Sequence, residues 1–294
     1  MYKKQIQQIY NIISVNCQRL KSMDLLNGDL GICLFFYNYA YYQGETSDYA
    51  DDILTKMIKL YQKSYMPNSS GVYELGWSIK YLDEHNYVKN DPSIWDIFNS
   101  FSMSDYSVAK IEKDLNSPLS IFTKGLYLCK SSSPQMIEKT LSDIKNVLNY
   151  INETRNIPLR FLVSLCYCLQ KCMDKKEYIC QSLQLEEKLL GIIEKKIRTD
   201  SPLSKDVYIL YRLLNCEAPK WLPIYEYNVI NDIYTNWQTV LYEDLISLPD
   251  SPDMEQLEEY LSDINLHVPV DKLGLDGLCS LGINLIRKSP QFVC

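Results

Sequence analysis

Apolar residues recur along the chain at the three- and four-residue spacing of an α-helix, and the segments that carry them are of two kinds. Segments 29–43 and 157–173 are apolar on nearly every face, which is typical of helices enclosed by neighbours. Segment 47–64 instead keeps its charged residues on one side. Its apolar stripe consists of Tyr49, Ile53, Met57 and Leu60. The two kinds alternate along the chain.

This alternation predicts an all-α fold of about six helical hairpins, because no run of residues has the pattern of a strand. Enclosed helices are predicted near 29–43, 71–86, 118–130, 157–173, 203–214 and 274–288. Amphipathic helices are predicted near 2–20, 47–64, 93–115, 134–151, 181–198 and 226–246. Helix starts are marked by a capping residue before proline at Asp91-Pro92, Ser117-Pro118 and Ser201-Pro202. The pattern is weakest over 215–268, which four prolines interrupt and Pro269 follows.

Glycine is concentrated at the starts of the predicted enclosed helices. A glycine inside a helix costs up to about 1 kcal/mol relative to alanine, so its recurrence there predicts close approach of backbones. An inner ring of crowded helices surrounded by amphipathic ones predicts an α/α toroid, with residues 1–294 forming a single domain. The glycines at these starts are Gly28, Gly31, Gly71, Gly76, Gly125, Gly274, Gly277 and Gly282.

Three of these helix starts share a glycine motif. They read NGDLGI at 27–32, GVYELGW at 71–77 and GLDGLCSLGI at 274–283. In order and spacing they resemble the motifs that open the inner helices of lanthionine synthetase C-like (LanC-like) proteins, which are α/α toroids. The resemblance covers about 20–130, extends over 131–200 and returns at 273–288. It implies a LanC-like protein associated with peptide modification or maturation.

The resemblance breaks at the family's zinc site. LanC-like cyclases hold zinc through a cysteine in a Trp-Cys-Tyr-Gly context and a Cys-His-Gly pair, and the metal activates a peptide thiol. Here the corresponding helix starts with SPLSKDVY at 201–208, the nearest cysteine is Cys216, and the chain has no Cys-His dipeptide. We therefore expect a shortened, non-catalytic relative that has no catalytic residue, metal or other cofactor and binds a peptide or a partner protein.

Two zinc hypotheses stay open. Cys166, Cys168 and Cys172 fall within two turns of one helix, although their apolar surroundings favour simple packing. A zinc-dependent cyclase with displaced ligands would use residues such as Cys216 and His267. His267 and the only other histidine, His85, lie in polar or turn-like contexts and are expected to be solvated.

Carboxylates occupy comparable positions at the starts of three predicted inner helices. Asp29, Glu74 and Asp276 are expected to gather at one mouth of the toroid, and with Trp77 and Tyr208 they are the candidates for a cavity rim that binds a ligand. Converging carboxylates could also act as acid and base in glycoside cleavage, so a carbohydrate-acting toroid is an alternative. An acidic residue near a helix N-terminus is, however, favoured by the helix dipole in any protein.

Composition excludes some partners. The net charge is −7 and no basic tract stands out, so nucleic acid is not an expected partner. No stretch is apolar enough for a membrane span, and the first residues lack the pattern of a secretory signal, so we expect a cytoplasmic protein. Its ten cysteines are accordingly expected to be reduced.

Overall fold

Every regular element that the computed structural model describes is a helix, which confirms the all-α prediction. The described residues are 2–20, 22–63, 69–89, 133–151, 157–199, 204–214, 219–222, 234–246, 248, 252–266 and 268–289. None of the helices within them is both long and apolar enough to cross a membrane.

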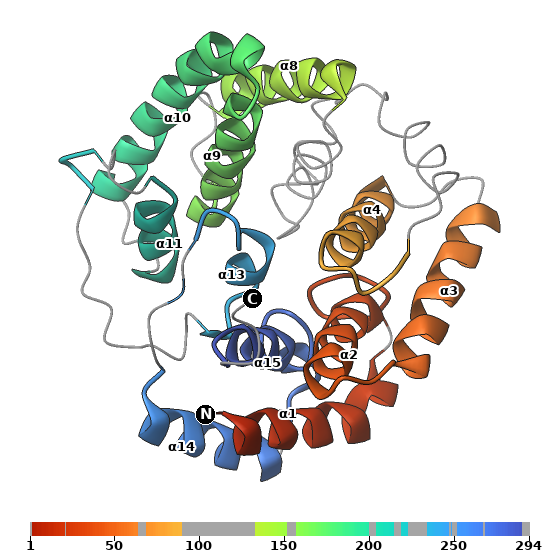
Figure 1. Cartoon of the computed structure of the whole chain (residues 1–294). Coiled ribbons are helices and arrows are strands. Elements are labelled where there is room, and N and C mark those ends of the chain that lie inside the picture. The colour runs from red at the N-terminus through yellow and green to blue at the C-terminus, as the bar shows by residue number, and fades with distance from the viewer. Residues whose placement is uncertain are drawn as a thin grey trace. The chain divides into compact units, whose positions relative to one another are not determined.

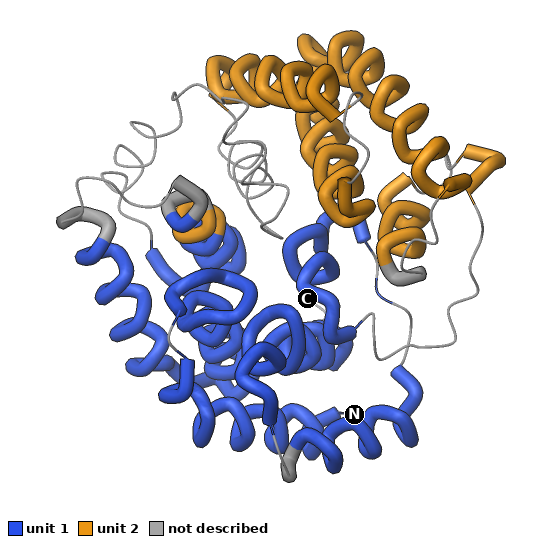
Figure 2. The backbone as a smooth tube through the Cα atoms, turned by 180° about the vertical axis from the view of Figure 1, so that it is seen from behind, with its two compact units in different colours: residues 1–71, 78–90, 228–294 blue, residues 72–77, 91–227 orange. Residues whose placement is uncertain are grey.

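The chain divides into two compact units, coloured separately in Figure 2. Unit 1 consists of residues 1–71, 78–90 and 228–294, and unit 2 of residues 72–77 and 91–227. The single domain expected over 1–294 stays a prediction.

Unit 1 is assembled from both ends of the chain. In Figure 1, α2 and α15 lie side by side, and α15 also packs against α1 and α13. Helix α1 further contacts α14, and α2 contacts α3. The elements of this unit are α1 (Lys3–Asn16), η1 (Cys17–Arg19), α2 (Asp29–Gln43), α3 (Asp48–Lys63), both ends of α4 (Ser69–Glu84), α13 (Trp237–Leu241), α14 (Met254–Leu266), η4 (Val270–Lys272) and α15 (Leu278–Arg287).

Burial in unit 1 follows the two kinds of helix that the sequence predicts. Helix α15 is buried from Leu278 to Ile286, and α2 is buried from Leu30 to Ala40, so both are enclosed. Helix α3 is amphipathic, but its buried face is shifted from the predicted stripe, because Tyr49 is 45% exposed and Leu60 is 39% exposed. The residues that α3 buries are Ala50, Ile53, Leu54 and Met57.

Glycine lets the start of α2 and the residues before α15 meet through their backbones. A Cβ atom at Gly274 would lie 1.9 Å from the carbonyl oxygen of Leu26, and one at Gly31 would lie 3.2 Å from the amide nitrogen of Leu275. Backbone atoms cannot move aside as a flexible side chain can, so neither position accepts a larger residue without a shift of the chain. The predicted close approach of backbone is confirmed at Gly28, Gly31, Gly274 and Gly277, whereas Gly282 meets the side chain of Phe35. Gly125 lies outside the described residues.

Unit 2 has α9 at its centre. This helix contacts α8, α10 and α11, and buries most of its residues, as predicted for segment 157–173. Helix α10 buries only one face, as predicted for an amphipathic helix. The elements of this unit are α8 (Pro134–Ile151), α9 (Leu159–Met173), η2 (Lys176–Tyr178), α10 (Ile179–Thr199), α11 (Ser204–Leu214) and the middle of α4.

The region of 215–268 differs most from the sequence prediction. Helix α14 is not among the predicted helices, although it buries Leu257, Leu261 and Ile264 at helical spacing, because prolines interrupt the pattern on both sides. Of the helix predicted near 226–246, the part over 226–233 lies outside the described residues, and residues 235 and 236 break the helix before the five-residue α13. The helices predicted near 93–115 and 118–130, and the three proline-marked starts, lie outside the described residues.

Candidate functional site

Two of the predicted rim residues lie at adjoining helix starts of unit 1. Asp29 is the first residue of α2, and Asp276 lies two residues before α15. The backbone N–H of Asp276 donates to the carbonyl of Leu26 at 3.3 Å, which ties the two starts together. Burial raises the pKa of the Asp29 carboxyl, and the nearby charge of Lys56 partly opposes this. The structure thus brings together the helix starts that carry these two carboxyls.

The other three rim candidates belong to unit 2. Glu74 and Trp77 are buried in the middle of α4, and Tyr208 is half-buried in α11. The guanidinium carbon of Arg212 lies 6.0 Å from the centre of the Tyr208 ring, within reach of a cation–π interaction. Since the five candidates are divided between two units, a common rim stays a prediction.

The cysteines of α9 are buried thiols. Cys166, Cys168 and Cys172 are not joined in disulfides, and burial together with the charge of Glu186 raises the pKa of the Cys166 thiol. Within the described ranges, no three His, Cys, Asp or Glu side chains are grouped so that they could hold a metal ion. Cys216 and His267, the ligands of the displaced-zinc hypothesis, lie outside those ranges, so that hypothesis stays a prediction.

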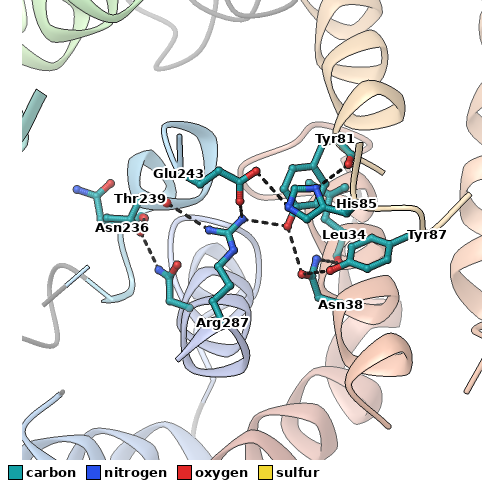
Figure 3. Close-up of polar contacts among 10 residues, drawn as sticks. Leu34, Asn38, Tyr81, His85, Tyr87, Asn236, Thr239, Glu243 and Arg287 are labelled. Carbon is teal, nitrogen blue, oxygen red and sulfur yellow. Dashed lines mark hydrogen bonds and ion pairs between the residues drawn. The ribbon is translucent and has the colours of Figure 1, made fainter. Parts of the chain in front are cut away.

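A polar cluster that the sequence did not reveal joins α15, the segment after α13 and the end of α4, all in unit 1 (Figure 3). Arg287, in the last turn of α15, forms an ion pair with Glu243. Its guanidinium also donates to the hydroxyl of Tyr81 at 3.0 Å and to the carbonyl of Thr239 at 3.4 Å. The Arg287 and Glu243 side chains are 16% and 19% exposed. We call Arg287, Glu243, His85 and Tyr81 the Arg287 cluster.

His85 is part of this cluster and is not the solvated residue that the sequence suggested. Its side chain is 28% exposed, and its ring centre lies 4.2 Å from that of Tyr81 and 5.5 Å from that of Tyr87. Nδ1 is 2.8 Å from the backbone carbonyl oxygen of Tyr81, and Nε2 is 3.4 Å from Oε1 of Glu243. A carbonyl only accepts, so Nδ1 carries a proton, and Nε2 donates to Glu243 when the ring is protonated.

Hydrogen bonds to Asn38 of α2 fix the tyrosines of this region. The hydroxyls of Tyr81 and Tyr87 donate to Oδ1 of Asn38 at 3.2 and 2.9 Å, and the amide of Asn38 donates to the carbonyl of Leu34 at 2.8 Å. Burial raises the pKa of Tyr81 to about 12, although the positive charge of Arg287 acts in the opposite direction.

The end of α4 has a local sequence reason for its shape. Asn86 adopts a left-handed conformation with φ of 58°, which asparagine tolerates better than most residues. The N–H of Asn86 donates to the carbonyl of Asp83 at 3.0 Å, and that of Tyr87 to the carbonyl of Leu82 at 2.8 Å. These are the two hydrogen bonds of a Schellman motif, and they turn Tyr87 back toward His85.

Few sequence signals point to the cluster. Arg287 is the single charged residue of α15, and Tyr81 and His85 are four residues apart, one helical turn. Neither pattern indicates that the two sets meet across about 200 residues of sequence, because hydrophobic periodicity carries no information on pairing of distant elements.

A scan against protein-family models, a search of the curated proteins and a search of the solved structures each found no match for the chain. Its function is therefore argued from its residues and their geometry.

Proposed function

We propose that this chain is a non-catalytic relative of the LanC-like proteins, an α/α toroid that binds a peptide or a partner protein during peptide maturation in the cytoplasm. The observation that carries the proposal is the backbone contact between the first and the last glycine motif, where Gly274 meets Leu26 and Gly31 meets Leu275. A closed ring of hairpins requires its last inner helix to lie beside its first, as α15 lies beside α2.

The packing within each unit also supports the proposal. In unit 1, the enclosed helices α2 and α15 are accompanied by α1 and α3, which bury one face. In unit 2, the enclosed α9 is accompanied by α10, which also buries one face. Pairs of one enclosed and one half-buried helix are the repeating element expected of such a toroid.

Two features of the sequence support the proposal of binding without catalysis. The sequence lacks the Cys-His pair that the cyclases use, while it carries 24 tyrosines. Tyrosine combines an apolar ring with a polar hydroxyl, which suits contact with peptides. Tyr41, which is 54% exposed, continues the aromatic stack of the Arg287 cluster, its ring centre 5.1 Å from that of Tyr87.

Two measurements on the purified full-length chain test this proposal. Peptide binding is measured by probing a random peptide array and then titrating each retained peptide by calorimetry, with Tyr41→Ala as the variant. We expect retained peptides to bind wild-type protein, and their affinity to fall in the variant. The second measurement is metal content after dialysis. Stoichiometric zinc, or an array that retains no peptide, would contradict a non-catalytic peptide binder.

One observation favours the alternative of a carbohydrate-acting enzyme. A carboxyl whose pKa is raised by burial, as that of Asp29 is, suits a general acid in glycoside cleavage. If this alternative holds, release of reducing sugar from a polysaccharide panel should be lost in Asp29→Asn and in Asp276→Asn. Equal release by these variants and the wild type would eliminate it.

A further inference from the structure

Arg287 and His85 are side chains of the kind that bind a carboxylate. The carboxylate that they contact belongs to Glu243 of the same chain. Arg287 contacts Oε2 of Glu243, and Nε2 of His85 lies 3.4 Å from Oε1, so each carboxylate oxygen faces a different donor (Figure 3). A guanidinium that faces a carboxylate forms a charge-assisted hydrogen bond with it, which is stronger than a neutral one, and an imidazole adds a second donor when both of its nitrogens carry protons.

The receptor side of this contact is held in place independently of Glu243. The carbonyl of Tyr81 fixes His85 through Nδ1, and the rings of Tyr81 and Tyr87 pack against the imidazole. The hydroxyl of Tyr81 accepts a hydrogen bond from Arg287. His85 directly follows the 16-residue α4, and Arg287 ends the 10-residue α15, so both donors are positioned by regular helices. A binding site requires hydrogen-bond donors that other residues hold in place when no ligand is bound.

The occupant side lies around α13. Residues 234–246, which we call the strap, include this five-residue helix. Asn284 of α15 holds the strap by donating to the carbonyl of Tyr234 at 2.9 Å and to the hydroxyl of Thr239 at 2.7 Å. Asn284 and Arg287 are three residues apart, so one face of α15 carries both attachments.

Two buried polar atoms at this attachment lack partners. Among the described residues, neither Oδ1 of Asn284 nor Nε2 of Gln238 in α13 makes a hydrogen bond. Buried polar atoms without a partner favour any state in which water reaches them. If the strap lifted from α15, hydration of these two atoms would offset part of the cost of breaking the hydrogen bonds to Asn284. Because the strap also buries the side chains of Trp237, Leu241 and Tyr242, what a ligand has to displace is the Glu243 side chain and not the whole strap.

We propose that Arg287 and His85 form a binding site for a ligand carboxylate, and that the Glu243 carboxylate fills it as an internal competitor until a ligand displaces it. The inference rests on the proposed function for the source of that carboxylate, which is a peptide with an acidic side chain or a free C-terminus. Ligand binding then replaces the Glu243 carboxylate at Arg287.

Acetate, a small carboxylate, tests the site without any peptide. The full-length variant Glu243→Ala removes the internal competitor, and its thermal unfolding midpoint is followed during titration with sodium acetate against sodium chloride at equal ionic strength. We expect a saturable rise of the midpoint that is specific to acetate. The matched control is Glu258→Ala, which removes a glutamate of α14 that is 58% exposed and 4.0 Å from Lys4. Neither this control nor the double variant Glu243→Ala/Arg287→Met should show the rise.

Peptide binding tests the source of the carboxylate. Acetylated trialanine with a free C-terminus is expected to bind Glu243→Ala at least about tenfold more tightly than wild type, because the site no longer has to be vacated first. The C-terminal amide of the same peptide should not show this gain. If acetate raises the midpoint but the free-acid and amide forms of the peptide bind equally, the carboxylate site is supported and a peptide as its ligand is contradicted.

A second variant, Glu243→Gln, tests the site if Glu243→Ala does not fold. Glu243→Gln keeps the shape of the side chain without its charge and should show the same acetate dependence. If Glu243→Ala is unfolded in chloride, recovery of its far-UV helical signal in acetate is the expected result. The inference is overturned if acetate acts on both Glu243 variants no differently from its action on Glu258→Ala, or if its effect survives removal of Arg287.

Discussion

Gly274 lies so close to Leu26 that a Cβ atom on the glycine would stand 1.9 Å from the carbonyl oxygen of the leucine. The two residues are almost the whole chain apart in sequence, and each sits just before an enclosed helix, α15 and α2 respectively. Their contact is therefore where the C-terminal segment of unit 1 joins the N-terminal one. The backbone N–H of Asp276, two residues after Gly274, donates to the carbonyl of the same Leu26 at 3.3 Å.

Substitution of Gly274 by alanine should strongly destabilise the protein. The added methyl group meets backbone atoms, and overpacking of this kind costs typically about 1–3 kcal/mol, occasionally more. We expect the loss to reach at least the upper end of that range, measured as a lower midpoint of urea unfolding with an unchanged slope.

Gly191→Ala is the control for this substitution. Gly191 lies within α10, and a Cβ atom there would have no atom within 4 Å outside its own helix. Alanine at an open helical position is expected to stabilise by about 0.5–1 kcal/mol. If both substitutions shifted the midpoint in the same direction, close packing at Gly274 would not be the cause.

The sequence predicts individual helices better than their contacts. Segments 29–43 and 134–151 match α2 and α8 residue for residue, because a continuous apolar pattern with clear flanks defines a helix locally. Helix α14 escapes prediction where Pro249, Pro252 and Pro269 obscure its period. Proline marks a break in the pattern without showing whether a helix resumes beyond it.

The candidate site is predictable only where it depends on helix starts. The sequence places Asp29 and Asp276 at comparable helix starts, and the structure brings those starts together. The contact of Arg287 with Glu243 and His85 depends on how three distant segments pack, which periodicity cannot supply. The prediction of a solvated His85 is wrong for this reason, since its polar sequence neighbours indicate solvent whereas its neighbours in space are two tyrosine rings.

Alkaline pH should destabilise unit 1 through its buried tyrosines. Burial raises the pKa of Tyr81 from 10.0 to about 12, so between these values the folded state holds a proton that the unfolded state releases. Stability is thus retained below pH 10 and is lost as pH rises toward 12. Urea unfolding followed between these pH values should show the decline. Tyr81→Phe, which cannot ionise, should show a shallower one, and an equal slope in this variant would contradict the assignment to Tyr81.

The Asp29 carboxyl should likewise lower stability as pH rises, but in the acid range. Burial raises the pKa of this carboxyl, opposed by Lys56, so the folded state holds its proton more tightly than the unfolded chain does. Stability is therefore greatest in acid, below the unfolded value of 3.8, and falls as pH rises through the folded pKa. We expect Asp29→Asn to be more stable than wild type at neutral pH, with the difference disappearing in acid.

Lys56→Met provides the check on the Asp29 prediction. Without the lysine charge the pKa of Asp29 should rise further, so this variant should lose stability at neutral pH relative to wild type. In the double variant Asp29→Asn/Lys56→Met the effect of the lysine should be smaller than in the single variant, since its charge has no carboxylate to act on. Additive effects in urea unfolding would show that the two side chains do not interact.

The turn after α4 should be sensitive to the residue at position 86 in a way that depends on backbone conformation alone. Asn86 has a φ of 58°, a region that glycine enters freely and alanine enters at a cost of roughly 1–2 kcal/mol. Asn86→Ala should therefore lower the unfolding midpoint, and Asn86→Gly should be close to wild type. The same turn places Tyr87 over His85, so Asn86→Ala should also speed amide hydrogen exchange at Tyr87, whose N–H bonds to Leu82 at 2.8 Å. Equal loss of stability in both variants would instead indicate that the asparagine side chain, and not the left-handed backbone, holds the end of α4.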